Sequence, residues 1–186
     1  MRLFIAVNLP DKMRNKIWEA TVPLREHGDS IRWVVSEGMH LTLKFLGDVP
    51  ADREETVGHA LERSASGVTP FVLRLGGFGA FPNVRRAKVF WVGCEAPSPL
   101  QLLHRQVEGE LGEIGFEQEA RSFHPHLTLG RVRRQADSKH VRGVVSIFEQ
   151  LNFTGEVPVC SVELMQSELT PAGANYTVRK SVELTQ

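Results

Sequence analysis

The tetrapeptide His-Leu-Thr-Leu occurs twice in this chain of 186 residues, at His40–Leu43 and again at His126–Leu129. Chance seldom repeats four residues in a chain of this length and composition. Each copy lies in a stretch typical of a strand, where residues i and i+2 share one face. The repeat therefore predicts two matched His and Thr pairs, with the Leu residues pointing into a core behind them.

These residue types suit proton transfer at a phosphate. An imidazole titrates near pH 6.5, so His40 and His126 could each accept or donate a proton near neutrality. The hydroxyls of Thr42 and Thr128 can donate hydrogen bonds to non-bridging oxygens. Pairs on facing strands would place a base on one side of a phosphorus atom and an acid on the other. That arrangement favours in-line displacement, in which the entering and leaving oxygens lie on opposite sides.

A metal site is the alternative at the second motif. His124 and His126 share a face and could bind one metal ion. No further Cys or carboxylate lies within four residues, so a third ligand would have to come from a distant part of the chain. The sequence therefore favours a site without metal.

Strands and helices are interspersed along the chain. Strands are expected at 3–7, 31–35, 40–46, 71–75, 87–94, 127–132, 157–169 and 176–184, with an irregular segment at 76–86 and a turn at 171–175. Helices are expected at 11–27, 50–65, 98–112 and 138–148, the third opened by a capping box of Ser98 and Gln101. The order predicts an α+β fold, and its loose repetition predicts two similar lobes within one domain, residues 1–186.

Composition limits the class of protein. Lys plus Arg and Asp plus Glu both number 22, and 41% of residues are hydrophobic. These values exclude a disordered chain and a uniformly basic coat for nucleic acid, but they allow a local site for an anion. The two cysteines cannot build a disulfide framework, and the apolar stretch 3–7 is too short to span a bilayer. We therefore expect a cytoplasmic monomer without a membrane partner.

The paired motifs and their flanks resemble the two-histidine (2H) phosphoesterase superfamily, most closely the bacterial and archaeal RNA 2′,3′-cyclic phosphodiesterases, also called 2′-5′ RNA ligases. The resemblance spans nearly the whole chain. It rests on the opening Leu3–Pro10, on Trp33 with His40–Gly47, on Phe123–Arg131, and on Ser167, Leu169, Gly173 and Tyr176.

The resemblance implies a bilobal fold with antiparallel sheets around a central cleft. It implies hydrolysis of RNA 2′,3′-cyclic phosphate ends, or of small cyclic nucleotides, to 2′-phosphates. His126 would be the base for water and His40 the acid for the departing 3′ oxygen, while Thr42 and Thr128 bind the phosphate. No metal or nucleotide cofactor is expected, and the pH profile should be bell-shaped.

The motifs define the phosphate chemistry but not the body of the substrate. Related 2H reactions therefore fit as well: 2′-5′ RNA ligation, cleavage of 2′-5′ oligonucleotides, or opening of an ADP-ribose cyclic phosphate. A protein of another class, an RNA-end-binding module without turnover, would use the histidines only to hold the phosphate. The intact His and Thr in both copies favour the enzyme.

Arg131 is a further candidate for substrate binding. It belongs to the second motif, but strand alternation puts it on the face opposite His126 and Thr128. A bend at Gly130 could turn its guanidinium to the phosphate, and a structural role is the alternative.

Aromatic and basic residues near the motifs have two interpretations each. Phe45 and Phe123 could stack on a base, although packing in the core is the first expectation. The basic residues at 85–88 and 131–134 form either a solvated surface or a rim that guides RNA.

Overall fold

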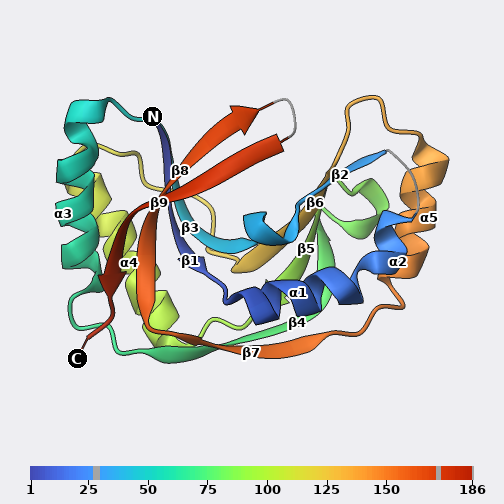
Figure 1. Cartoon of the computed structure of the whole chain (residues 1–186), viewed down its shortest axis with the longest axis horizontal. Coiled ribbons are helices and arrows are strands. Elements are labelled where there is room, and N and C mark those ends of the chain that lie inside the picture. The colour runs from blue at the N-terminus through green and yellow to red at the C-terminus, as the bar shows by residue number, and fades with distance from the viewer. Residues whose placement is uncertain (27–29, 171–172, 186) are drawn as a thin grey trace.

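In a computed structural model, which describes residues 1–26, 30–170 and 173–185, nine strands form one antiparallel sheet (Figure 1). The strands are β1 (Arg2–Asn8), β2 (Ile31–Trp33), β3 (His40–Asp48), β4 (Phe71–Phe81), β5 (Val89–Cys94), β6 (His126–Val132), β7 (Thr154–Val159), β8 (Ser161–Thr170) and β9 (Gly173–Glu183). They follow the order β7-β4-β5-β6-β3-β1-β8-β9, and β2 pairs with β6.

Helices cover the two halves of this sheet separately. They are α1 (Asp11–Ala20), α2 (Val22–Arg25), α3 (Glu54–Ala65), α4 (Ser98–Glu113) and α5 (Ser138–Phe148), with short 3-10 turns η1 (Ser36–Gly38), η2 (Ala51–Arg53) and η3 (Val84–Arg86). Helices α3 and α4 pack together against the half with β3, β8 and β9, while α2 and α5 pack together beside the other half (Figure 1). This α+β architecture confirms the predicted fold class.

The two halves meet where β3 pairs with β6. The motif leucines lie in the main hydrophobic core and none is more than 5% exposed: Leu41, Leu43, Leu127 and Leu129. The predicted apolar stripe of α4 is buried in the same core: Leu100, Leu103, Val107 and Leu111. Both motifs are therefore anchored from behind, as their alternation predicts.

The helix expected at 11–27 is broken at Thr21. The Thr21 hydroxyl donates to the Ile17 carbonyl at 2.8 Å, and a new short helix, α2, starts at Val22 with Pro23 in its first turn. Proline is tolerated there but not in a helix interior, so the chain restarts instead of continuing. The expected end at residue 27 lies outside the described residues, as do Pro171 and Ala172 of the expected turn.

Two strand predictions differ most from the structure, and the last strand begins at Gly173, inside the turn expected at 171–175. The run expected at 157–169 is two strands separated at Cys160, since β7 pairs with β4 whereas β8 pairs with β1 and β9. Strand β4, expected to end at residue 75, continues into the segment expected to be irregular and ends at Phe81, and the rest of that segment contains η3. The alternation of apolar residues carries no information about which neighbour a strand pairs with, so two consecutive strands can be taken for one. The glycines inside β4 are residues typical of a loop, so part of this strand was predicted to be irregular.

The capping box expected at α4 does not form. Pro97 occupies the position before the helix without a side-chain cap, and Gln101 Nε2 donates to the Ala96 carbonyl at 2.6 Å. Among the described residues, no helix is long and apolar enough to cross a membrane.

A buried ion pair ties the first motif strand to the segment that leads to the second motif. Lys44 Nζ lies 2.7 Å from Glu108 Oε2 and donates to the Glu117 carbonyl at 2.8 Å. The same Glu108 oxygen accepts from the Glu119 amide at 3.0 Å. The two side chains are only 4% and 13% exposed, so neither charge can be rehydrated if its partner is removed.

Removing the cation of this pair should destabilise the fold strongly. We expect Lys44→Ala to lower the free energy of unfolding by about 3 kcal/mol, because Glu108 would stay buried without a counter-charge. Urea denaturation measures the loss. The matched control is Arg63→Ala in the more exposed Arg63–Glu110 pair, which should cost less than about 1 kcal/mol. Equal losses in the two variants would contradict a stabilising role for the buried pair.

Candidate active site

The four motif side chains lie together on one face of the sheet. Leu41 is paired with Leu127 across the antiparallel strands β3 and β6. Since residues i and i+2 share a face, His40 and Thr42 lie on one face of β3, and His126 and Thr128 lie on one face of β6. The two His-x-Thr motifs therefore lie side by side in the sheet. The sequence had suggested two facing strands. In the structure β3 and β6 are instead neighbours in one sheet and do not face each other across a gap.

His40 begins β3 and lies between two aromatic rings. Its ring centroid is 4.8 Å from that of Phe4 and 5.0 Å from that of Tyr176. Burial lowers the pKa of His40 to about 4, while a hydrogen bond to the backbone of Gly38 raises it and the charge of Arg14 lowers it further. In the empty site His40 is therefore a neutral imidazole near pH 7.

His126 has a matching environment. Its Nδ1 lies 2.7 Å from the carbonyl oxygen of His124, two residues earlier, just as His40 bonds to the backbone of Gly38. Its ring lies 4.9 Å from Phe81 and 6.2 Å from Trp91. Burial lowers the pKa of His126, the His124 carbonyl raises it, and the charges of His124 and Arg131 lower it. With Nδ1 donating to the carbonyl, the neutral ring leaves Nε2 as its basic nitrogen.

Trp91 lies beside His126 because the residue opposite Trp91 on the neighbouring strand is a glycine, which leaves room for the indole ring. Gly79 pairs with Trp91 across β4 and β5, and a Cβ at Gly79 would lie 2.1 Å from the indole ring. The indole N–H is buried and has no protein partner among the described residues. Sequence reasoning missed this aromatic wall. The sequence signal for this wall is a tryptophan that pairs with a glycine-rich strand, and that signal can be read only when the pairing of the two strands is known.

Both threonine hydroxyls are available on this face. Thr42 is exposed and Thr128 is half-buried, opposite Trp91 on β5. Within residues 1–26, 30–170 and 173–185, neither hydroxyl makes a hydrogen bond to protein. The two hydroxyls can therefore donate to oxygens of a bound ligand.

Arg131 lies on the same face as His126 because β6 contains a bulge, which simple strand alternation does not predict. Trp91 pairs with Thr128 and Phe90 pairs with Gly130, so Leu129 is an extra residue in β6. The extra residue reverses the alternation, and the exposed Arg131 pairs with Val89 on the open face. The expected bend therefore occurs one residue before Gly130.

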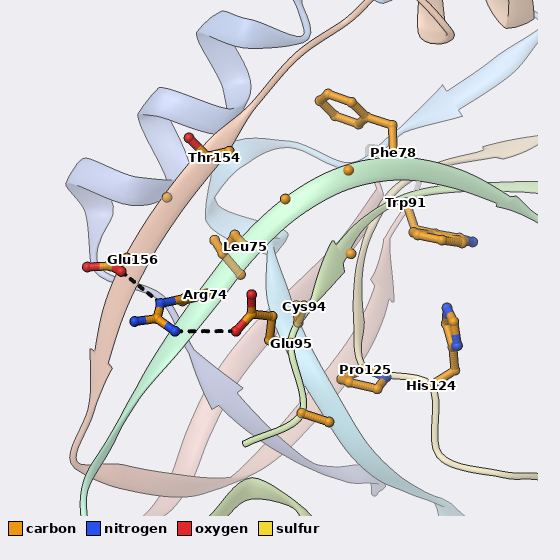
Figure 2. A pocket seen from close by; sticks show the side chains of 15 residues that line it. Arg74, Leu75, Phe78, Trp91, Cys94, Glu95, His124, Pro125, Thr154 and Glu156 are labelled. Carbon is orange, nitrogen blue, oxygen red and sulfur yellow. Dashed lines mark hydrogen bonds and ion pairs between the residues drawn. The ribbon is translucent and has the colours of Figure 1, made fainter. Parts of the chain in front are cut away.

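A hollow of about 790 Å³ adjoins the second motif (Figure 2). Trp91 and His124 line one end of it, and Arg74 lies between Glu156 and Glu95 at the other, with N–O distances of 2.9 and 3.7 Å. Its volume is within the range of small-molecule sites. The cavity therefore begins at Trp91 and His124, next to the second motif, and is large enough for a nucleotide.

The two phenylalanines near the motifs behave differently. Phe45 is 53% exposed with the Arg2 guanidinium 4.9 Å from its ring centroid, so the expected core packing is wrong for this residue. Phe123 packs against the core, stacked on His104 at 3.9 Å, as expected. In the part of the chain that the structure describes, no group of three or more His, Cys, Asp or Glu side chains could hold a metal ion.

This arrangement, two His-x-Thr strands paired at the centre of an antiparallel sheet, defines a two-histidine phosphoesterase. Comparison with known proteins gives the same result, since the family model of the 2'-5' RNA ligase superfamily matches residues 11–171. The chain belongs to the 2'-5' RNA ligase superfamily and is an enzyme of the phosphoesterase class.

Relatives are similar over nearly their full length. A protein of Methanothermobacter thermautotrophicus named RNA 2',3'-cyclic phosphodiesterase is 33% identical over 177 residues, 95% of each chain. One of Thermotoga maritima with the same name is 34% identical over 179 residues, covering 96% of this chain and 92% of its own.

Solved structures share the fold. Escherichia coli LigT, solved in complex with 3'-AMP, superposes with a TM-score of 0.79 at 28% identity, covering 100% of this chain and 98% of its own. A protein of Thermus thermophilus gives the same TM-score at 31% identity, covering 99% of this chain and 98% of its own. These matches confirm the predicted family and fold.

The lowered pKa of His40 should make stability depend on pH. The unfolded chain takes up this proton below about pH 6.5, whereas folded His40 does so only near pH 4. Unfolding therefore binds a proton between these values, and stability is lost as the pH falls through this window. We expect wild type to lose about 1–2 kcal/mol more than His40→Gln between pH 7 and pH 5. Urea denaturation at both pH values measures this, and equal losses would contradict the assignment.

Proposed function

We propose that the protein hydrolyses RNA 2′,3′-cyclic phosphate ends to 2′-phosphomonoesters. The observation that carries the proposal is the pairing of Leu41 with Leu127 across β3 and β6, which brings the two His-x-Thr motifs side by side in the sheet. The relatives named RNA 2',3'-cyclic phosphodiesterase support the same reaction. The hollow beside His124 adds room for a nucleoside, so small cyclic nucleotides are substrates too.

In this proposal His126 is the base. Its Nε2 takes a proton from water, because Nδ1 is already engaged with the His124 carbonyl. The water oxygen attacks phosphorus, the bond from phosphorus to the 3′ oxygen breaks, and His40 gives its proton to that oxygen. The product is a 2′-phosphate with a free 3′ hydroxyl. Hydroxyls of Thr42 and Thr128 and the guanidinium of Arg131 hold the non-bridging oxygens.

The substrate itself must charge His40. Both histidines have lowered pKa values, and burial depresses that of His40 to about 4. A bound phosphate carries negative charge, which raises the pKa of a nearby imidazole, most strongly where solvent is excluded. The more buried His40 therefore gains most from the anion. This supports His40 as the acid.

We also propose that residues 1–186 act as a single domain and as a cytoplasmic monomer. Helix α1 follows β1, yet it lies beside the other half of the sheet, so the two halves are interleaved along the chain (Figure 1). Zero formal charge and two unpaired cysteines are consistent with this proposal.

The reaction is tested with cyclic-ended RNA and 2′,3′-cyclic nucleotides in EDTA, with the product identified as 2′- or 3′-phosphate. We expect a 2′-phosphate. His40→Ala and His126→Ala should each lower turnover at least about 100-fold, because each removes one proton-transfer step. The control is His140→Ala, at an exposed position on α5. Near-normal turnover in either motif variant contradicts the proposal, as does activity that EDTA abolishes and zinc restores. Tight binding without turnover by wild type would instead indicate an RNA-end-binding module.

The roles of the two histidines can be separated with a cyclic substrate whose 3′ bridging oxygen is replaced by sulfur. A thiolate leaves without protonation, so the acid becomes dispensable while the base does not. We expect the loss caused by His40→Ala to shrink by roughly tenfold or more, and the loss caused by His126→Ala to stay the same. The reverse pattern would exchange the two roles. Single-turnover rates on the oxygen and sulfur substrates give both values.

A further inference from the structure

Two arginines are paired directly opposite each other at the edge of the candidate site. Arg32 of β2 is the Cα partner of Arg131 of β6, and both residues are exposed. Their neighbours on β2, Ile31 and Trp33, pack against the core on the other face. Arg32 therefore points to the same open face as Arg131, although it belongs to neither motif.

Nothing within the described part of the protein neutralises this pair. Among the described residues, no carboxylate lies within ion-pair distance of Arg32 or Arg131. Like charges directly opposite each other on paired strands destabilise a sheet. Another arginine of the same sheet has a carboxylate opposite it: Arg74 is the cross-strand partner of Glu156 and donates a hydrogen bond to it at 2.9 Å. The Arg32–Arg131 pair is thus an arrangement that folding alone does not favour and that an external anion would stabilise.

The pair is aligned with the phosphate-binding residues. Because Leu129 is an extra residue, Thr128 and Arg131 are only two positions of the neighbouring strand apart, about 7 Å, and Arg32 lies one strand further, about 5 Å away. The Leu129 bulge keeps Thr128 and Arg131 on one face. Arg131 therefore serves the cyclic phosphate, whereas Arg32 lies one strand beyond it, where the next phosphodiester of an RNA strand would run.

We propose that Arg32, one strand beyond the phosphate-binding Arg131, binds a phosphodiester of the RNA strand that precedes the cyclic end. Guanidinium groups suit this ligand because their planar N–H groups match two phosphate oxygens at once. The inference rests on the proposed function, which it deepens: the enzyme prefers an oligonucleotide with a cyclic end over a cyclic mononucleotide, and Arg32 contributes to that preference.

The test compares Arg32→Gln with wild type on a 2′,3′-cyclic mononucleotide and on a short cyclic-ended oligonucleotide. We expect the ratio of kcat/KM for the oligonucleotide to that for the mononucleotide to fall roughly tenfold, the size of one lost charged contact, mainly through KM. The control, Arg105→Gln, removes an equal charge from an exposed site on α4, which covers the opposite face. It should keep the wild-type ratio.

Binding gives a second readout that needs no turnover. For an oligonucleotide ending in a 2′-phosphate, the slope of log K against log salt should lose about 0.7 in Arg32→Gln. Arg32→Lys should keep the slope. The midpoint of thermal unfolding of Arg32→Gln should not fall, because removing one of two like charges relieves repulsion.

Several outcomes would overturn the proposal: an unchanged substrate ratio, an equal loss on both substrates, the same loss in Arg105→Gln, or an unchanged salt slope. Failure of the proposed function is distinguishable from these. If wild type hydrolyses neither substrate, the salt slopes of wild type and Arg32→Gln still test whether Arg32 binds an RNA phosphate.

Discussion

The pairing of Leu41 with Leu127 joins the two halves of the sheet and sets the geometry of the open face. Both leucines are fully buried, so moving either strand by one residue would drive a histidine and a threonine into the core and expose the leucines. Burial of apolar side chains therefore fixes the relative position of polar ones. The catalytic proposal depends on this register more than on any hydrogen bond.

Partial burial of the histidines has an electrostatic consequence. Aromatic rings on both sides exclude water from His40 and His126, and desolvation lowers both pKa values. A site that penalises positive charge when empty favours it when an anion binds, since the same exclusion of water strengthens the attraction. The His126 ring is also held by the His124 carbonyl two residues earlier, which orients it without adding another titratable group.

Departures from regular strand geometry are concentrated around the site. A register shift between Thr42 and Lys44 on β3 turns Lys44 toward the helices, where it meets Glu108. An extra residue at Leu129 turns Arg131 toward the open face. Both bulges change which face a side chain occupies, so one sheet can anchor a buried ion pair on one side and present a guanidinium on the other.

From the sequence alone, the motifs and their flanks indicated the family by resemblance, and the order of strands and helices predicted an α+β fold. Alternation predicted the buried leucines and the shared face of each His and Thr, because it is a local property that any strand preserves. The tertiary structure decided which strands pair, and hence that the two His-x-Thr motifs lie side by side, that Arg131 lies on the open face and that Arg32 lies opposite it. It also placed Trp91 over Gly79 and exposed Phe45, against expectation. Pairing, register and bulges depend on contacts between residues far apart in the chain, and no local pattern encodes those contacts.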